Sequence, residues 1–166
     1  TFTEAPVGFR AYDDKPVEIR EGKDWARLDF TGDTVKGSAL DFSGFAAAPA
    51  GREGFVRVSA DGDFYLEKTG RRIRFNGANL IGAPLVAEAA DVEEMVLRMK
   101  RCGYNAVRFH HCERQLVGKD AKSGLDFDPD LLDRFHRTWA ICATNGLYIT
   151  YDIYSSREVY PGEIVG

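Results

Sequence analysis

The chain has 166 residues, of which 44% are hydrophobic and 29% are charged, and its formal net charge is −4. This composition is typical of a globular protein with one sizeable core or two small ones. It argues against a nucleic-acid-binding surface, which would need a basic face, and no apolar run approaches the ~18 residues of a membrane span. The three cysteines have no CxxC spacing, so neither a disulfide framework nor a zinc knuckle is indicated.

Residues 1–66 are predicted to form short strands and loops. Four runs have the composition of strands: residues 17–20, 25–30, 55–58 and 63–67. The last two flank Asp61-Gly62, which predicts a hairpin. Because no catalytic spacing occurs here, we expect a β-rich accessory segment that precedes a separate region at residues 67–166.

The region from residue 71 onward alternates strands with amphipathic helices. Strands are predicted at residues 74–80, 105–109 and 147–154. The first helix is expected to start with Asp91 as N-cap in a capping box with Glu94, and to end at Gly103. Its buried stripe is Val92, Met95, Val96 and Met99, which have helical spacing.

A second helix is predicted after a polar loop at residues 117–127. Asp128 is its N-cap, Pro129 occupies its first position, and Asn145-Gly146 ends it. Its inward stripe is Leu132, Phe135, Trp139 and Cys142. The resulting β-α-β-α-β order predicts two right-handed crossovers and a parallel sheet. We expect an α/β fold that forms the first three strands of a (β/α)8 barrel, with polar groups at the carboxyl ends of the strands.

Side-chain alternation predicts which polar groups face the barrel mouth. Arg108 and His110 share one face of their strand, while Val107, Phe109 and His111 share the other, which is expected to face the helices. On the third strand the inward set is Tyr148, Thr150, Asp152 and Tyr154, and the outward set is Leu147, Ile149, Tyr151 and Ile153. Two neighbouring strands therefore offer Arg108, His110, Asp152 and Tyr154 to one mouth.

Several roles are open for this cluster. An inward arginine is costly unless it is paired, so Arg108 is expected to hold a carboxylate ionised. It could equally form a purely structural ion pair with Asp152. A metal site from His110, His111, Glu113 and Asp152 is a further alternative, although adjacent histidines point to opposite sides of a continuing strand.

The segments 74–80 and 103–111, together with 125–133 and 145–149, resemble the (β/α)8 glycoside hydrolases of the cellulase, mannanase and β-galactosidase superfamily. The resemblance implies a retaining glycosidase in which Arg108 orients the nucleophilic carboxylate and His110 also takes part in catalysis. It implies substrate-binding roles for Asn79, His111, Asp152, Tyr154 and Arg157. No cofactor and no metal is implied, the partner is a carbohydrate, and a secreted or periplasmic location is expected.

The two catalytic carboxyl groups of such an enzyme are glutamates after the fourth and seventh strands, which lie beyond this chain. We therefore expect the rest of the barrel to come from the same polypeptide or from another chain, and the chain alone to be inactive. Two other hypotheses remain: a non-catalytic carbohydrate-binding or assembly module, and a metal-dependent hydrolase that uses His110 and Asp152.

Overall fold

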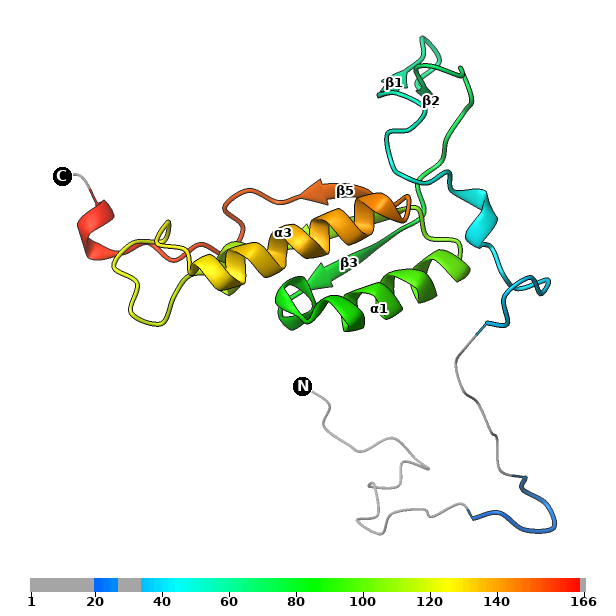
Figure 1. The fold of residues 1–166 in the computed structure, drawn as a ribbon, viewed down its shortest axis with the longest axis horizontal. Helices are drawn as coiled ribbons and strands as arrows, with labels where there is room; N and C mark the ends of the chain where they lie inside the picture. Colours follow the sequence, from blue (N-terminus) through cyan, green and yellow to red (C-terminus); the bar gives the residue numbers. More distant parts are fainter. Residues whose placement is uncertain (1–19, 27–33, 165–166) are drawn as a thin grey trace, which may run out of the picture. The chain divides into compact units, whose positions relative to one another are not determined.

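The computed structural model describes residues 20–26 and 34–164, and the chain divides into two compact units, Thr1–Gly32 and Asp33–Gly166. The helices and strands formed by the described residues all lie in the second unit (Figure 1). The predicted strands at residues 17–20 and 25–30 fall mostly outside the described residues. The hairpin of the expected accessory segment belongs to the same compact unit as the βα region.

The elements alternate as predicted from residue 77 onward. In chain order they are η1 (Ser43–Phe45), β1 (Val56–Val58), β2 (Phe64–Leu66), β3 (Gly77–Ile81), η2 (Ala83–Val86), α1 (Ala89–Arg101), β4 (Ala106–His110), α2 (Glu113–Leu116), α3 (Pro129–Thr144), β5 (Tyr148–Tyr151) and η3 (Pro161–Glu163). β1 and β2 form the expected antiparallel hairpin, with Gly62 at a φ of 85° in its turn. β3, β4 and β5 form a parallel sheet in that order, so the α/β class is confirmed.

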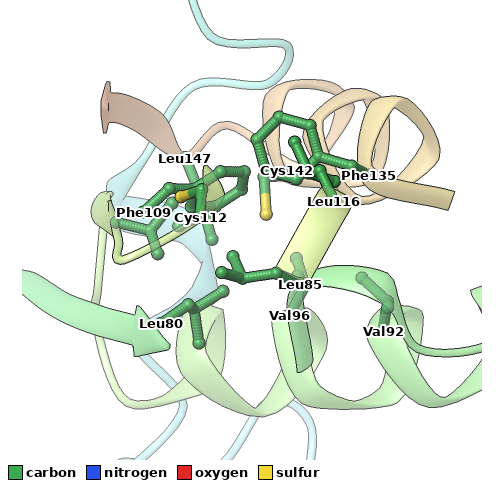
Figure 2. Packing of buried hydrophobic residues seen from close by; sticks show 11 residues of the cluster. Leu80, Leu85, Val92, Val96, Phe109, Cys112, Leu116, Phe135, Cys142 and Leu147 are labelled. Atoms are coloured by element: carbon green, nitrogen blue, oxygen red, sulfur yellow. The ribbon is translucent and has the colours of Figure 1, made fainter. Parts of the chain in front are cut away.

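One face of the parallel sheet carries the hydrophobic core. Leu80, Val107 and Phe109 of the strands pack with Val92 and Val96 of α1 and with Phe135 and Cys142 of α3. Leu85 of η2 and Leu116 of α2 are also fully buried in this cluster (Figure 2). Both helices therefore cover the same face, as two right-handed crossovers require. The opposite face carries the side chains of Asn79, Arg108 and Thr150, which are neighbours in the strand register.

The start of α1 differs from the prediction. The helix begins at Ala89 with Glu88 as N-cap, so Asp91 lies in its first turn and is not the cap. Two alanines with high helix propensity extend the helix by almost one turn, and an acidic residue in the first turn still interacts favourably with the helix dipole. The predicted N-cap of α3 is confirmed, because the Asp128 side chain accepts hydrogen bonds from the N–H groups of Asp130 and Leu131.

Both helices end in the same C-terminal motif, as predicted from their glycines. Gly103 has a φ of 83°, its N–H donates to Lys100, and the N–H of Tyr104 donates to Met99. Gly146 has a φ of 89° and makes the equivalent bond to Ala143. These are the two hydrogen bonds of a Schellman motif, which favours glycine at the left-handed position.

The segment before the hairpin covers the C-terminal ends of these helices. The N–H of Phe42 donates to the carbonyl of Arg101 at 2.9 Å, and the N–H of Ala50 donates to that of Ala143 at 2.8 Å. The Arg101 carbonyl at the helix end thereby gains a partner, and the Ala143 carbonyl, which already accepts from Gly146, gains a second hydrogen bond. The segment lies at the end of the sheet where β4 and β5 begin, so the opposite end, where the strands finish, is left to the polar residues.

The side chain of Asn105 joins the beginnings of β3 and β4. Its Nδ2 donates to the carbonyl of Arg74 at 2.7 Å, and its Oδ1 accepts from the N–H of Asn76 at 2.8 Å. Residues 74–76 thus bond to a side chain and do not extend β3, which begins three residues later than the predicted strand. Over the described residues, the structure contains no helix that is long and apolar enough to cross a membrane.

Candidate site at the carboxyl ends of the parallel strands

Arg108 and Asp152 form a bidentate ion pair at the carboxyl ends of β4 and β5. The guanidinium donates from Nε to Oδ1 at 2.9 Å and from Nη2 to Oδ2 at 2.6 Å. The Arg108 side chain is 47% exposed, whereas that of Asp152 is 17% exposed. Side-on pairing of this kind fixes the orientation of both groups. Arg108 thus holds a carboxylate of its own chain, which is the ion pair with Asp152 that the sequence analysis gave as an alternative role.

His110 binds the same carboxylate through its Nδ1, which contacts Asp152 Oδ2. Hydrogen bonds from Arg108 and then from His110 lower the pKa of Asp152 from 3.8 to about 2. The carboxylate is therefore an acceptor at neutral pH, so the proton of this contact lies on Nδ1. In a neutral His110, Nε2 is then an unprotonated nitrogen able to accept a proton. The Asp152 carboxylate fixes this tautomer of the ring, which is an arrangement suited to proton transfer.

Asn79 and Thr150 extend this polar row across the sheet. The register places Asn79 beside Arg108 on one side and Thr150 on the other. All three are exposed on the face that α1 and α3 leave open. Four of the predicted site residues, Asn79, Arg108, His110 and Asp152, are therefore brought together on one face.

His111 does not lie on the helix side, where alternation placed it. β4 ends at His110, and His111 has a left-handed φ of 54°. Its ring packs against that of His110, with 3.6 Å between ring centroids. Its Nδ1 is buried and has no hydrogen-bond partner among the described residues. Alternation failed because the strand stops one residue before His111.

Tyr154 likewise lies past the end of its strand. β5 stops at Tyr151, three residues before the end of the predicted strand, and Tyr154 has a φ of 59° and is 63% exposed. Ile153 is also highly exposed, so the prediction that it faces the helix layer is wrong. The N–H of Asp152 still donates to the carbonyl of Phe109 in β4, but the backbone has left the strand conformation by Tyr154, so period-two alternation no longer applies there.

Arg157 lies against the ring of Tyr154, with its guanidinium carbon 5.7 Å from the ring centroid. It also pairs with Glu163 at 2.6 Å. Glu163 accepts further bonds from the hydroxyl of Ser123 and the N–H groups of Gly124 and Tyr160. These bonds, the one from Ser123 foremost, lower the pKa of Glu163 to about 2. Arg157 therefore joins Tyr154 to the loop at residues 117–127.

Glu113 is a residue to which sequence reasoning gave no role beyond the metal alternative. It is only 4% exposed, and its carboxylate accepts from the N–H of Tyr154 and the hydroxyl of Ser156. Its position directly after a polar strand end was visible in the sequence, but its burial was not. No group of three His, Cys, Asp or Glu side chains in the described part of the chain is arranged to hold a metal ion.

A hollow lies at the end of the sheet opposite the candidate site. It is lined by Phe45, Ala46, Ala47, Arg71, Arg72, Ile73, Arg74, Asn76, Gly103, Asn105 and Tyr148. Arg71 and Arg72 are already paired with Glu53 and Asp63. None of the predicted site residues lines it, and we place the candidate site at the carboxyl ends of the strands.

Comparisons of the chain with protein-family models, with curated proteins and with solved structures gave no match.

Proposed function

We propose that this chain is the N-terminal part of a retaining glycoside hydrolase and supplies the first three strands of its (β/α)8 barrel. The observation that carries the proposal is the Arg108–Asp152–His110 group at the ends of adjacent parallel strands, on a polar face that the helices leave open. Catalytic groups of such barrels lie at the carboxyl ends of the strands.

The arrangement of the strands supports the barrel. β3, β4 and β5 are neighbours in sequence order, and the two crossover helices lie on one face. Among the described residues, β3 and β5 each pair with β4 only, so both outer edges have unused hydrogen-bonding groups. Parallel sheets occur almost only with both faces covered. Further strands, from the same polypeptide or from another chain, would pair with these edges and turn the polar face into a barrel interior.

In the completed site, Arg108 and Asp152 would act as a fixed pair beside the sugar. Arg108 retains Nη1 for a further acceptor, which in a retaining glycosidase is the nucleophilic carboxylate. His110 would hold or move a proton at Nε2. Asn79, His111, Asp152, Tyr154 and Arg157 would contact the carbohydrate, and both catalytic glutamates would come from the other strands.

The test is hydrolysis of a panel of aryl glycosides by the complete barrel protein and its variants. Arg108→Ala should lower kcat about 100-fold or more, because a misplaced catalytic group costs this much, while the far-UV circular dichroism stays unchanged. Arg137→Ala is the matched control, since Arg137 is an exposed arginine that pairs with Asp133 on α3. Wild-type turnover in Arg108→Ala would refute the role of Arg108.

One observation favours a second candidate, a non-catalytic carbohydrate-binding or assembly module. Arg108 and Asp152 already satisfy one another within this chain, as a structural ion pair would. That candidate predicts glycan binding, measured by calorimetry, without hydrolysis of any aryl glycoside. The metal-dependent hydrolase has less support, because Asp152 is occupied by Arg108 and His110. Stoichiometric zinc or manganese in chelator-free protein would restore it.

A further inference from the structure

The loop after β5 is bonded to the residues that follow β4 by a buried carboxylate. Glu113 is almost inaccessible to solvent, yet it accepts from the N–H of Tyr154 and from the hydroxyl of Ser156. Neither partner is a cation. Since a buried carboxylate is costly unless its acceptor positions are used, these two bonds make its burial tolerable and restrict where the loop can lie.

A third bond connects the same two segments in the opposite sense. The N–H of His111 donates to Oγ of Ser155 at 3.3 Å. Both His111 and Tyr154 have left-handed backbone conformations, which non-glycine residues adopt only when the surrounding structure imposes them. The bonds therefore act at the two points where the backbone is strained.

These contacts lie directly beside the Arg108–Asp152–His110 group. Asp152 is two residues before Tyr154, and His110 precedes His111, so any shift of the loop displaces both members of the histidine–carboxylate contact. The same bonds hold the backbone from which the Tyr154 ring projects, and the exposure of that ring and its contact with Arg157 suit it to lie against a ligand.

We infer that Glu113 is a positioning residue: its buried carboxylate holds Tyr154 in the left-handed conformation and thereby sets the places of Asp152 and the Tyr154 ring in the site. Its use in glycoside hydrolysis depends on the proposed function, but its effect on the loop does not. Glu113 itself contacts no substrate, because its side chain is enclosed by the protein.

The experiment measures amide hydrogen exchange at residue resolution in Glu113→Asp and Glu113→Gln. The aspartate side chain is one methylene shorter and cannot reach both Tyr154 and Ser156, so the Tyr154 amide should exchange at least tenfold faster than in the wild type. Glutamine has the same length, can accept from the Tyr154 N–H and can donate to Ser156, so Glu113→Gln should restore most of the protection. The β4 amides serve as an internal reference for global opening.

Glu94→Asp is the matched control, because Glu94 is an exposed glutamate paired with Arg98 on α1. Unchanged exchange of the Tyr154 amide in Glu113→Asp would overturn the inference. Equal acceleration of the β4 amides would also overturn it, since the effect would then be global destabilisation. Ser156→Ala removes one of the two bonds without touching Glu113 and should accelerate exchange of the Tyr154 amide by a smaller factor.

The second measurement separates the inference from the proposed function. With the aryl glycosides, Glu113→Asp in the complete barrel protein should lower kcat/KM at least tenfold, and Glu113→Gln should recover part of the loss. If the wild type hydrolyses no glycoside but the exchange pattern is as expected, the glycosidase proposal fails and the positioning role stands. If hydrolysis is found but Glu113→Asp retains it fully, the positioning role in the site fails.

Discussion

Asp152 shows how one carboxylate can serve two neighbours at the end of a strand. Its two oxygens accept from the Arg108 guanidinium, and one of them also contacts His110 Nδ1. The arginine keeps the carboxylate charged, and the charged carboxylate fixes the histidine tautomer. The chemistry available to His110 therefore depends on the arginine with which it shares this carboxylate.

The lowered pKa of Asp152 predicts how stability responds to acid. A carboxyl whose pKa is lower in the folded state than in the unfolded state contributes stability above the unfolded pKa and loses it as the pH falls. For Asp152 this window runs from about 4 down to about 2. We expect the free energy of unfolding to fall less steeply across this window in Asp152→Asn than in the wild type, as measured by urea unfolding at stepped pH. Parallel curves would contradict the assignment, and the Glu163 contribution should remain in both.

The cysteines should differ in reactivity. Burial raises the pKa of Cys112 to about 12, with further contributions from Glu113 and Asp152, and burial alone raises that of Cys142 to about 12. Only Cys102 is exposed. Because the thiolate is the reactive form, a thiol reagent at pH 8 should label one equivalent rapidly, and Cys102→Ser should abolish the rapid phase. Rapid labelling of two or three equivalents in native protein would contradict the burial of Cys112 and Cys142.

At the scale of single residues, alternation predicted the direction of a side chain only within the strand itself. Alternation placed Arg108 and His110 correctly because both lie within β4. It failed at His111, Ile153 and Tyr154, all of which follow the end of a strand. The residues just after these strand ends contact partners more than 40 positions away, such as Tyr154 with Glu113, and no local pattern contains that information.

At the scale of elements, the two Schellman ends connect helix termination to the packing of another segment. An added Cβ on Gly146 would lie 2.7 Å from the carbonyl oxygen of Ala47, and one on Gly103 would lie 3.3 Å from Cβ of Phe42. The glycines therefore meet two demands, a left-handed backbone and a close approach of the segment that covers the helix ends.

Gly146→Ala should be more destabilising than Gly62→Ala. Both glycines have similar positive φ values, 89° and 85°, but nothing lies near an added Cβ at Gly62. Left-handed strain should cost about 1–2 kcal/mol in each variant, and overpacking against Ala47 should add about 1–3 kcal/mol at Gly146 only. Chemical denaturation measures both values, and equal losses would show that the close approach has no energetic effect.

Helix ends were more predictable than helix beginnings and strand ends. Gly103 and Gly146 mark termini because few residues other than glycine tolerate their backbone conformation, which is a local property. Asp91 was mistaken for an N-cap because acidic residues also favour the first turn. The short helix α2 at Glu113–Leu116 was not predicted, since its anchors are the buried Glu113 and Leu116 and their partners are distant in sequence.

For the molecule as a whole, the compact unit that begins at Asp33 includes both the hairpin and the βα region. The predicted division at residue 66 would separate the hairpin from residues that it contacts. The ring of Phe64 in β2 packs against that of Phe75, which in turn packs against that of Tyr148 at the start of β5. Leu66 is itself buried. A hairpin that was expected to be accessory is thus packed against the beginning of the parallel sheet.

Truncated proteins should distinguish a division of the chain after Gly32 from one after residue 66. Removal of residues 1–32 leaves the whole of the unit that begins at Asp33 in place, with the hairpin, the parallel sheet and their core. Removal of residues 1–66 should cost at least about 2 kcal/mol, since it deletes the hydrogen bonds of Phe42 and Ala50 to the helix ends at about 1 kcal/mol each. Equal stability of the two truncated proteins, measured by thermal and urea unfolding, would favour the division at residue 66.

The Asn105 side chain sets the alignment of the sheet from the end opposite the candidate site. A slip of β4 by one residue along β3 would carry its amide about 3.3 Å from the backbone of residues 74–76 and turn every side chain of the strand to the other face. Because this alignment is secured where the strands begin, the loops where they finish are not needed to set the register of the strands. Insertions and substitutions in those loops could therefore change which side chains are presented at that end without altering the strand register.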